Sequence, residues 1–332
     1  MSDFGTSPGD TLLRYFVGID GGGTKTAVCA ASAEDHTVRY ATTAGSSWRE
    51  HGVLKVAQTL KDAVKGLLSD NHSHIAGIAM GLPCHGESVE GDHTLEEAIR
   101  LVFPDIPFYL TNDVEVGWAG SLALKPGINI VAGTGAIAFG KDARGKTARC
   151  GGWSEFFGDE GSCYWIGRKV MELFSKQSDG RLPRDALYAT VHRELKLKDD
   201  IDFIDLMYTE YIGYRKQVAS LQLLAEKAAL AGAPSAIALY KEAVDELCLL
   251  VDALRNRLDF TAPAWTVSYS GGLFKAKDLV LKRFSEKIEK DGGKLALPCF
   301  DPAEGAVMLA VERFYPDGLE QIQKVLMEKK NE

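Results

Sequence analysis

Residues 15–32 read YFVGIDGGGTKTAVCAAS, and this stretch decides how the rest of the chain is interpreted. An apolar run opens it, three glycines interrupt it at 21–23, and small and β-branched residues follow. That composition directly after a glycine turn favours a second strand, whereas a dinucleotide-binding fingerprint requires a helix there. A Walker A loop is excluded as well, because no Gly-Lys-Ser/Thr ends the turn. We therefore predict strand, glycine turn, strand.

The tip of this predicted hairpin is suited to anions, because a turn without side chains lets backbone N–H groups approach a ligand closely. The tip residues and the donors beside them are Gly21, Gly22, Gly23, Thr24 and Lys25. Asp20 ends the first strand, where its carboxylate could hold a divalent cation through water. The alternative is an ordinary tight hairpin without a ligand, since glycines are common in such turns.

The same arrangement recurs at residues 128–140, INIVAGTGAIAFG: an apolar strand, a Gly/Thr turn and a second apolar strand. We interpret this as an internal duplication of architecture rather than of detailed sequence. Thr134 and Gly135 could bind phosphate oxygens through a hydroxyl and backbone amides, although a plain β-turn is the alternative. Two such tips, one in each of two similarly built domains facing a cleft, could hold one polyphosphate from opposite sides.

Hydrophobic periodicity predicts the other elements. In the first half we expect strands within 15–45 and at 75–80 and 108–110, with helices at 54–68, 94–102 and 114–124. In the second half we expect strands at 128–132, 136–140, 266–270 and 295–297, with helices at 162–175, 184–195, 201–231, 235–258, 275–290, 302–311 and 319–329. This is an α/β pattern.

The domain boundary is expected near residues 119–127. It gives a first domain at 1–120, joined by the C-terminal helix at about 315–332, and a second at 121–314. The second domain carries a large helical insertion at about 161–258.

Bulk properties narrow the class of protein. A chain of 332 residues with 45% hydrophobic and 25% charged residues is typical of a globular protein. Its net charge of −8, with no basic stripe, argues against nucleic acid as the main partner. The six cysteines form no C-x-x-C pair, no stretch is apolar enough to span a membrane, and residues 1–14 form a polar leader. We therefore expect a cytoplasmic protein with reduced thiols and no membrane partner.

Asp113 follows a predicted strand and precedes a predicted helix. It could serve as a helix N-cap, which is a common role for aspartate. It could equally be a general base that takes a proton from an acceptor hydroxyl during phosphoryl transfer. Asn112 beside it could cap the helix or orient a substrate.

Residues 150–162, CGGWSEFFGDEGS, are dense in glycine, acidic and aromatic residues, which suits a sugar pocket. Carboxylates accept hydrogen bonds from sugar hydroxyls, and an aromatic ring can lie against sugar C–H groups. The alternatives are that Trp153 belongs to the core and that Asp159 caps the following helix. Gly271 and Gly272 end another predicted strand, where a base or ribose could approach the backbone. The alternative is an ordinary tight turn between a strand and a helix, which has a similar sequence.

In this order, the motifs resemble the sugar kinase/heat-shock protein 70/actin superfamily. Within it, the chain resembles the N-acetylglucosamine kinase and BadF/BadG/BcrA/BcrD ATPase group. The stretches VGIDGGGTKT and INIVAGTGAIAFG resemble the two phosphate motifs, and LTNDVEVGWAG and DPAEGAVMLA resemble the two connecting segments. SYSGGLF resembles the adenosine motif, and GGWSEFFGDEGS resembles the sugar-side motif, which is the most specific of them.

The resemblance implies two ribonuclease H-like (actin-like ATPase) domains around a cleft, and ATP-dependent phosphorylation of an amino sugar at its 6-hydroxyl. It implies ATP and Mg²⁺ as cofactors, Asp113 as the base and Asp20 as the magnesium site through water. The implied nucleotide-binding residues are Gly21, Gly22, Gly23, Thr24, Lys25, Thr134, Gly135, Gly271 and Gly272. The implied sugar-binding residues are Ser46, His85, Asn112, Asp113, Thr134, Gly152, Trp153 and Asp159. Domain closure over the cleft would limit wasteful hydrolysis of ATP.

Two loops depart from the group's pattern. Its amino-sugar kinases often have asparagine where this chain has residues 45–48, GSSW, and smaller residues where it has 83–85, PCH. Both loops would help to select the sugar, so the resemblance implies an amino sugar without naming it: N-acetylglucosamine, glucosamine or N-acetylmuramic acid. The Cys/His zinc signature of the related ROK proteins is absent, and we expect neither zinc nor DNA binding.

Two other functions stay open. One is an activator ATPase that serves a partner enzyme; such relatives share an iron–sulfur cluster between subunits, which needs clustered cysteines. The other is a sugar sensor without turnover, which the intact Asp20, Asp113 and phosphate tips disfavour. The helical insertion offers surface for a homodimer, as relatives use.

Overall fold

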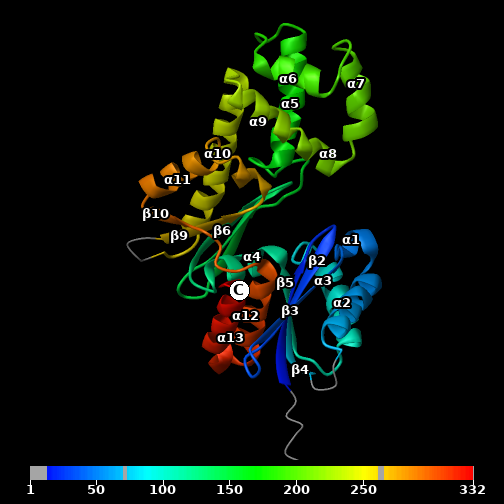
Figure 1. Ribbon diagram of the computed structural model, residues 1–332, viewed down its shortest axis with the longest axis vertical. Helices are drawn as coiled ribbons and strands as arrows, with labels where there is room; N and C mark the ends of the chain where they lie inside the picture. The colour runs from blue at the N-terminus through cyan, green and yellow to red at the C-terminus, as the bar shows by residue number, and fades with distance from the viewer. Residues whose placement is uncertain (1–12, 70–72, 261–264, 332) are drawn as a thin grey trace, which may run out of the picture. The chain divides into compact units, whose positions relative to one another are not determined.

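The computed structural model describes residues 13–69, 73–260 and 265–331. They form two compact units, each with a five-stranded mixed sheet in the described residues (Figure 1). Unit 1 comprises Met1–Lys125 and Pro298–Glu332, and unit 2 comprises Pro126–Leu297. Most of the predicted leader, residues 1–12, lies outside the described residues, and Leu13 already begins a strand.

Unit 1 contains a sheet in the order β3-β2-β1-β4-β5. Its strands are β1 (Leu13–Gly21), β2 (Lys25–Ser32), β3 (Thr37–Ala44), β4 (Ser73–Leu82) and β5 (Phe108–Asn112). Its helices are α1 (Trp48–His51), α2 (Val53–Leu67), α3 (Val89–Val102), α4 (Asp113–Leu122), α12 (Pro302–Phe314) and α13 (Leu319–Asn331), with a 3-10 turn η3 (Pro316–Gly318). The first three strands form the predicted antiparallel meander, and β1, β4 and β5 run parallel.

Strand β1 is buried on both faces, which explains its continuous apolar run. Val17 and Ile19 face a core shared with Leu60 of α2 and Ile99 of α3. On the other face, Gly18 lies directly against the backbone of α12. Figure 1 shows the consequence: α12 and α13 (red) lie beside β1–β3 (blue), although they come from opposite ends of the chain.

The unit boundaries differ from those expected from the sequence. We expected the first domain to end at 120 and only residues from about 315 to rejoin it. Instead, residues 298–314 also belong to unit 1, because α12 packs on β1, β4 and α4. Helix α3 also begins earlier than expected, at Val89, because the Ser88 side chain caps it by accepting from the Gly91 N–H.

The close approach of β1 and α12 makes Gly18 a sensitive position. A methyl group there would collide with the Ala303 carbonyl oxygen and the Val307 nitrogen, both of which are backbone atoms that cannot move aside. We expect Gly18→Ala to lower the free energy of unfolding by about 3 kcal/mol in urea titrations. Gly66→Ala is the matched control: it lies in α2, where the described chain leaves room for the methyl group, and it should stabilise by up to ~1 kcal/mol. Equal effects would contradict this packing.

Unit 2 repeats the topology of unit 1, with a sheet in the order β10-β9-β6-β7-β8. Its strands are β6 (Gly127–Ala132), β7 (Ala136–Lys141), β8 (Thr147–Gly151), β9 (Trp265–Ser270) and β10 (Gly293–Ala296). Strands β6, β7 and β8 are antiparallel neighbours, and β6, β9 and β10 run parallel. The predicted duplication of architecture is therefore confirmed, although β8 was not predicted.

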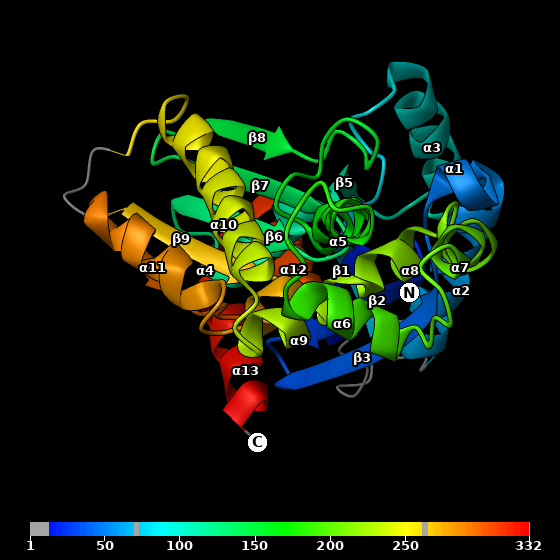
Figure 2. The same cartoon turned by 90° about the horizontal axis from the view of Figure 1, so that it is seen from above.

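The helices of unit 2 are α5 (Cys163–Ser178), α6 (Ala186–Glu194), α7 (Asp202–Leu206), α8 (Arg215–Ser220), α9 (Gln222–Leu230), α10 (Pro234–Arg255) and α11 (Leu281–Lys290), with a π-helical turn η1 (Met207–Tyr211) and a 3-10 turn η2 (Gly272–Lys275). Helix α10 lies along β6, β7 and β8 (Figure 2). Among the described residues, no helix combines the length and the hydropathy needed to cross a bilayer.

Two long helices expected from periodicity are wrong. The stretch 201–231 is divided into α7, η1, α8 and α9, because Ile212 is extended and Gly213 adopts a φ of 90°. The stretch 275–290 becomes a regular helix only at Leu281. Both stretches keep a helical spacing of apolar residues, so periodicity alone could not locate the breaks.

Candidate functional site

The β1–β2 hairpin carries the first glycine tip, and Gly23, Thr24 and Lys25 are exposed there. Ser46 packs beneath the tip: its N–H donates to the Gly22 carbonyl at 3.0 Å. A Cβ at Gly21 would overlap the Ser46 hydroxyl. That hydroxyl is buried and has no hydrogen-bond partner among the described residues. The tip therefore rests on the loop that the sequence assigned to sugar selection.

Two carboxylates from distant segments of unit 1 act electrostatically on a third, Asp20. Asp20 lies near the end of β1, Asp113 begins α4, and Asp301 precedes α12 as its N-cap. Burial, and then repulsion by Asp113 and Asp301, raise the pKa of Asp20 to about 7, while Lys25 acts in the opposite direction. Sequence reasoning missed Asp301; the Asp-Pro-x-Glu order identifies it as the N-cap of a helix with a capping box, though not as a neighbour of Asp20.

Asp113 is the first residue of α4 and not its N-cap, so the capping alternative is wrong. Asn112 takes that role, since its side chain accepts from the Val114 N–H at 3.2 Å. The Asn112 amide also donates to the His85 carbonyl at 2.7 Å, which fixes the loop after β4 beside α4. Gly81 allows this approach, because a Cβ there would overlap Val116 and crowd the Cα of Asp113.

The two loops that depart from the family pattern contact each other. Arg49, directly after the first loop, forms an ion pair with Glu87, shortly after the second; the Arg49 Nε lies 3.8 Å from a Glu87 carboxylate oxygen. Burial raises the pKa of the Cys84 thiol, and hydrogen bonds from Ser47 and Arg49 oppose this. Cys84 also adopts a φ of 66°, a conformation that non-glycine residues rarely adopt. The loops therefore form one packed assembly rather than two independent segments.

The second glycine tip joins β6 and β7 in unit 2. The carbonyls of Gly133 and Thr134 accept from the N–H groups of Cys163 and Tyr164, at 2.9 and 3.3 Å, so the tip is tied to the first turn of α5. Gly271 and Gly272 lie beside this tip, because a Cβ at Gly271 would overlap the backbone of Ala132 at the end of β6. Only a residue without a side chain fits at Gly271, where φ is 103°.

The sugar-motif loop also returns to this second tip. The Gly152 N–H donates to the Ala136 carbonyl at 2.9 Å, and the Asp159 carboxylate accepts from the Ala136 N–H at 3.2 Å. Asp159 is only 3% exposed and pairs with Arg215, a residue that sequence reasoning missed because it stands in the helical insertion outside every motif.

Two alternatives for this loop are wrong. Trp153 does not belong to the core: it is 67% exposed, and Phe156 and Phe157 beside it are exposed as well. Asp159 does not cap α5, because the Ser162 hydroxyl does so by accepting from the Trp165 N–H at 3.1 Å. Neither residue therefore has the structural role that its alternative assigned to it.

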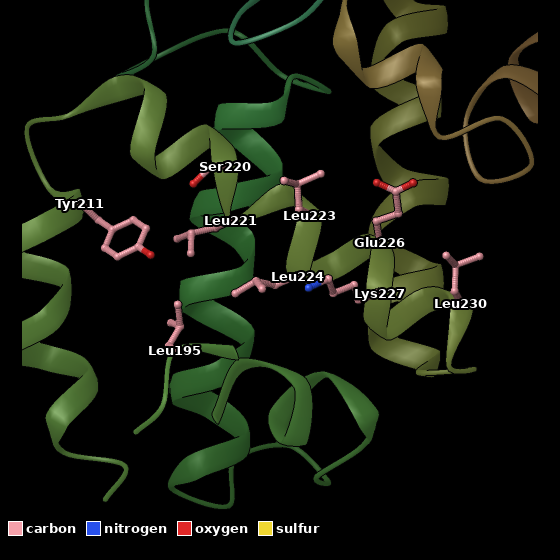
Figure 3. A pocket seen from close by; sticks show the side chains of 9 residues that line it. All are labelled: Leu195, Tyr211, Ser220, Leu221, Leu223, Leu224, Glu226, Lys227 and Leu230. Atoms are coloured by element: carbon pink, nitrogen blue, oxygen red, sulfur yellow. The ribbon is translucent and has the colours of Figure 1, made fainter. Parts of the chain in front are cut away.

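A pocket of about 440 Å³ lies elsewhere in unit 2, within the helical insertion (Figure 3). Its lining residues are Leu195, Tyr211, Ser220, Leu221, Leu223, Leu224, Glu226, Lys227 and Leu230. The lining is mostly leucine and includes none of the predicted site residues, so it does not match the chemistry expected of the nucleotide or sugar site.

Comparison with known proteins decides the family. The model of the BadF/BadG/BcrA/BcrD ATPase family matches residues 17–310. The chain belongs to this family. Membership of this ATPase family implies ATP as the nucleotide, and it confirms the resemblance that the motifs indicated.

Relatives of known name align over most of the chain. An N-acetylmuramic acid/N-acetylglucosamine kinase of Clostridium acetobutylicum is 30% identical over 305 residues, which are 90% of this chain and 98% of the relative. An N-acetyl-D-glucosamine kinase of Dictyostelium discoideum is 25% identical over 312 residues, with the same shares covered.

Solved structures share the fold. A candidate N-acetylglucosamine kinase of Chromobacterium violaceum superposes with a TM-score of 0.70 at 24% identity, over 90% of this chain and 99% of that one. A ROK-family glucokinase of Streptomyces griseus superposes with a TM-score of 0.51 at 16% identity, over 90% and 99%. The protein thus has the actin-like ATPase fold of sugar kinases, as expected from the motifs.

Among the described residues, no group of three or more His, Cys, Asp or Glu side chains is placed to hold a metal ion directly, so a magnesium ion at Asp20 would have to be held through water. Burial, and after it repulsion by Asp113 and Asp301, raises the pKa of Asp20 to about 7, and a bound cation would lower that pKa. Oxygen ligands with retained waters are what Mg²⁺ prefers. The exposed tip with Lys25 likewise fits phosphate groups.

Proposed function

We propose that this protein is an ATP-dependent kinase that phosphorylates the 6-hydroxyl of an amino sugar. N-acetylglucosamine is the leading substrate, and N-acetylmuramic acid and glucosamine are the others to test. The observation that carries the proposal is the position of Asp113: it starts α4 next to Asp20, in a chain whose two named relatives are both kinases of N-acetylated amino sugars.

In this proposal, the Asp113 carboxylate accepts the proton of the sugar hydroxyl as that oxygen attacks the γ-phosphorus. The bond between the γ-phosphorus and the bridging oxygen breaks in line, and ADP leaves. The first tip, residues 21–25, and the second tip with Thr134 and Gly135 hold phosphate oxygens through backbone N–H groups. Gly271 and Gly272 leave room for the adenosine. Asp20 would hold magnesium through water, and the ion would supply positive charge to the phosphates.

On the sugar side, the proposal assigns hydrogen-bond acceptors and an aromatic ring. Asp159 accepts hydrogen bonds from sugar hydroxyls, and the exposed Trp153 ring covers C–H groups. The other sugar-side residues are Ser46, His85, Asn112, Thr134 and Gly152. The Ser46 hydroxyl, which has no partner within the described parts of the chain, supports this, because a buried polar group without a partner is costly unless a ligand or water satisfies it.

Sugar-dependent release of ADP tests the proposal. The protein is incubated with ATP and Mg²⁺ and, in separate reactions, N-acetylglucosamine, glucosamine, N-acetylmuramic acid, glucose or no sugar. We expect release that depends on an amino sugar and a product phosphorylated at the 6-position by NMR. ADP release that is the same with and without every sugar would replace the kinase by the second candidate, an activator ATPase for a partner enzyme; hydrolysis of ATP agrees with the family name.

The state of the protein in the cell is part of the proposal. We propose a cytoplasmic homodimer without nucleic-acid or membrane partners. Sedimentation of the purified protein tests the dimer, and a monomer at micromolar concentration would contradict it.

A further inference from the structure

Arg215 connects the helical insertion to the sugar-motif loop. Its Nη2 pairs with Asp159, and its Nε lies 3.5 Å from a carboxylate oxygen of Glu155. The guanidinium also borders the second tip, because a Cβ at Gly135 would lie 2.7 Å from Nη2 and 2.9 Å from the Asp159 carboxylate. Arg215 therefore meets the loop and the tip at the same point.

The Asp159 carboxylate depends on this partner. It is 3% exposed, and burying a carboxylate is costly unless a charged partner and hydrogen bonds compensate. The Ala136 N–H supplies one hydrogen bond, and Arg215 supplies the opposite charge. Asp159 also adopts a φ of 59° and Ser154 a φ of 102°, so the surroundings must hold the loop in a strained backbone conformation.

The backbone of Arg215 is itself fixed relative to the tip. Its helix, α8, packs so closely on α5 that a Cβ at Gly167 would overlap the Val218 carbonyl. Helix α5 in turn donates to the tip carbonyls of Gly133 and Thr134. The tip, α5, α8, Arg215 and Asp159 thus form a closed ring of contacts that returns to the tip.

We propose that Arg215 is a positioning residue that holds the Asp159 carboxylate in place at the β6–β7 tip, so that the helical insertion helps to build the sugar site. The inference rests on the proposed function, in which Asp159 accepts hydrogen bonds from the sugar. It assigns to the insertion a direct part in sugar affinity and no part in the proton transfer by Asp113.

The test compares the wild type with Arg215→Gln, Arg215→Lys, Asp159→Asn and the double variant Arg215→Gln/Asp159→Asn. We expect Arg215→Gln to raise the KM for the sugar by about 30-fold, with the KM for ATP within about twofold of the wild type. Lysine keeps the positive charge but lacks the branched guanidinium that reaches both Asp159 and Glu155. The sugar KM of Arg215→Lys should therefore lie between those of the wild type and Arg215→Gln. Because both residues act through one carboxylate, the double variant should be no worse than Asp159→Asn.

Arg184→Gln is the matched control, because Arg184 lies in the same insertion and pairs instead with Asp200; it should leave both KM values unchanged. An unchanged sugar KM in Arg215→Gln, or effects that simply add in the double variant, would overturn the inference while the kinase function stands. If circular dichroism shows that Arg215→Gln does not fold, the sugar KM of Arg215→Lys is the test instead. An unchanged sugar KM in Arg215→Lys would then overturn the inference. A wild type without sugar-dependent turnover would overturn the proposed function, and the inference with it.

Discussion

Replacing Asp113 by asparagine is expected to lower kcat for sugar phosphorylation by about 10²–10⁴-fold, the usual contribution of a general base. Asparagine keeps the shape of the side chain and the start of α4, but it cannot accept the proton of the attacking hydroxyl. Asn112 caps the helix in either case, so the fold should persist. The measurement is kcat with the preferred sugar, together with the Kd for ATP by calorimetry, which should stay within a few-fold.

Asp105→Asn is the control for this variant, because Asp105 is an exposed residue of the same unit. The Asp113 variant has a second readout: removal of the Asp113 charge relieves part of the repulsion on Asp20, so the pKa of Asp20 should fall below about 7. Near-full activity of Asp113→Asn would show that Asp113 is not the base, whatever happens to Asp20.

Asp20→Asn is expected to abolish activity and yet stabilise the metal-free protein at alkaline pH. The pKa of Asp20 is about 7 in the folded protein, against an ordinary value of 3.8. Between these values the folded state retains a proton that the unfolded state has released. The stability associated with this proton is fully present below about pH 4 and is lost as the pH rises through 7.

The size of this effect follows from the same pKa values. Proton linkage lowers the free energy of unfolding of the wild type by about 1.4 kcal/mol for each pH unit between the two pKa values. The largest loss at pH 8 is therefore ~4 kcal/mol. Asparagine carries no charge and avoids this cost. In EDTA, urea unfolding should therefore show that Asp20→Asn gains about 2 kcal/mol more over the wild type at pH 8 than at pH 5.

Magnesium should reverse the comparison. At pH 8 a bound cation stabilises the folded wild type by mass action, and the variant, which lacks the proposed ligand, should gain less. Glu90→Gln, an exposed neutralisation in the same unit, controls for the overall change in charge. A stability difference between wild type and Asp20→Asn that is equal at pH 5 and pH 8 would contradict the raised pKa of Asp20.

The structure also shows why some expectations held and others failed. The two strand–glycine–strand hairpins were predictable, because alternation and glycine position are local properties of residues 15–32 and 128–140. The third strand of the second meander, β8, was not predicted, because its residues, TARCG, mix polar and small residues and show no strand pattern. Antiparallel pairing with β7 stabilises the strand instead.

By itself, the sequence determined the family, the α/β class and the duplicated architecture, since each depends on residues that are close together along the chain. Only the tertiary structure decided that α12 belongs to unit 1, that Asp301 joins Asp20 and Asp113, and that Arg215 pairs with Asp159. Asp20 and Asp301 stand 281 positions apart, and Arg215 stands 56 positions from Asp159. Such contacts arise when helices and strands pack and bury their apolar faces, and no local pattern of residues encodes which distant partner a side chain will meet.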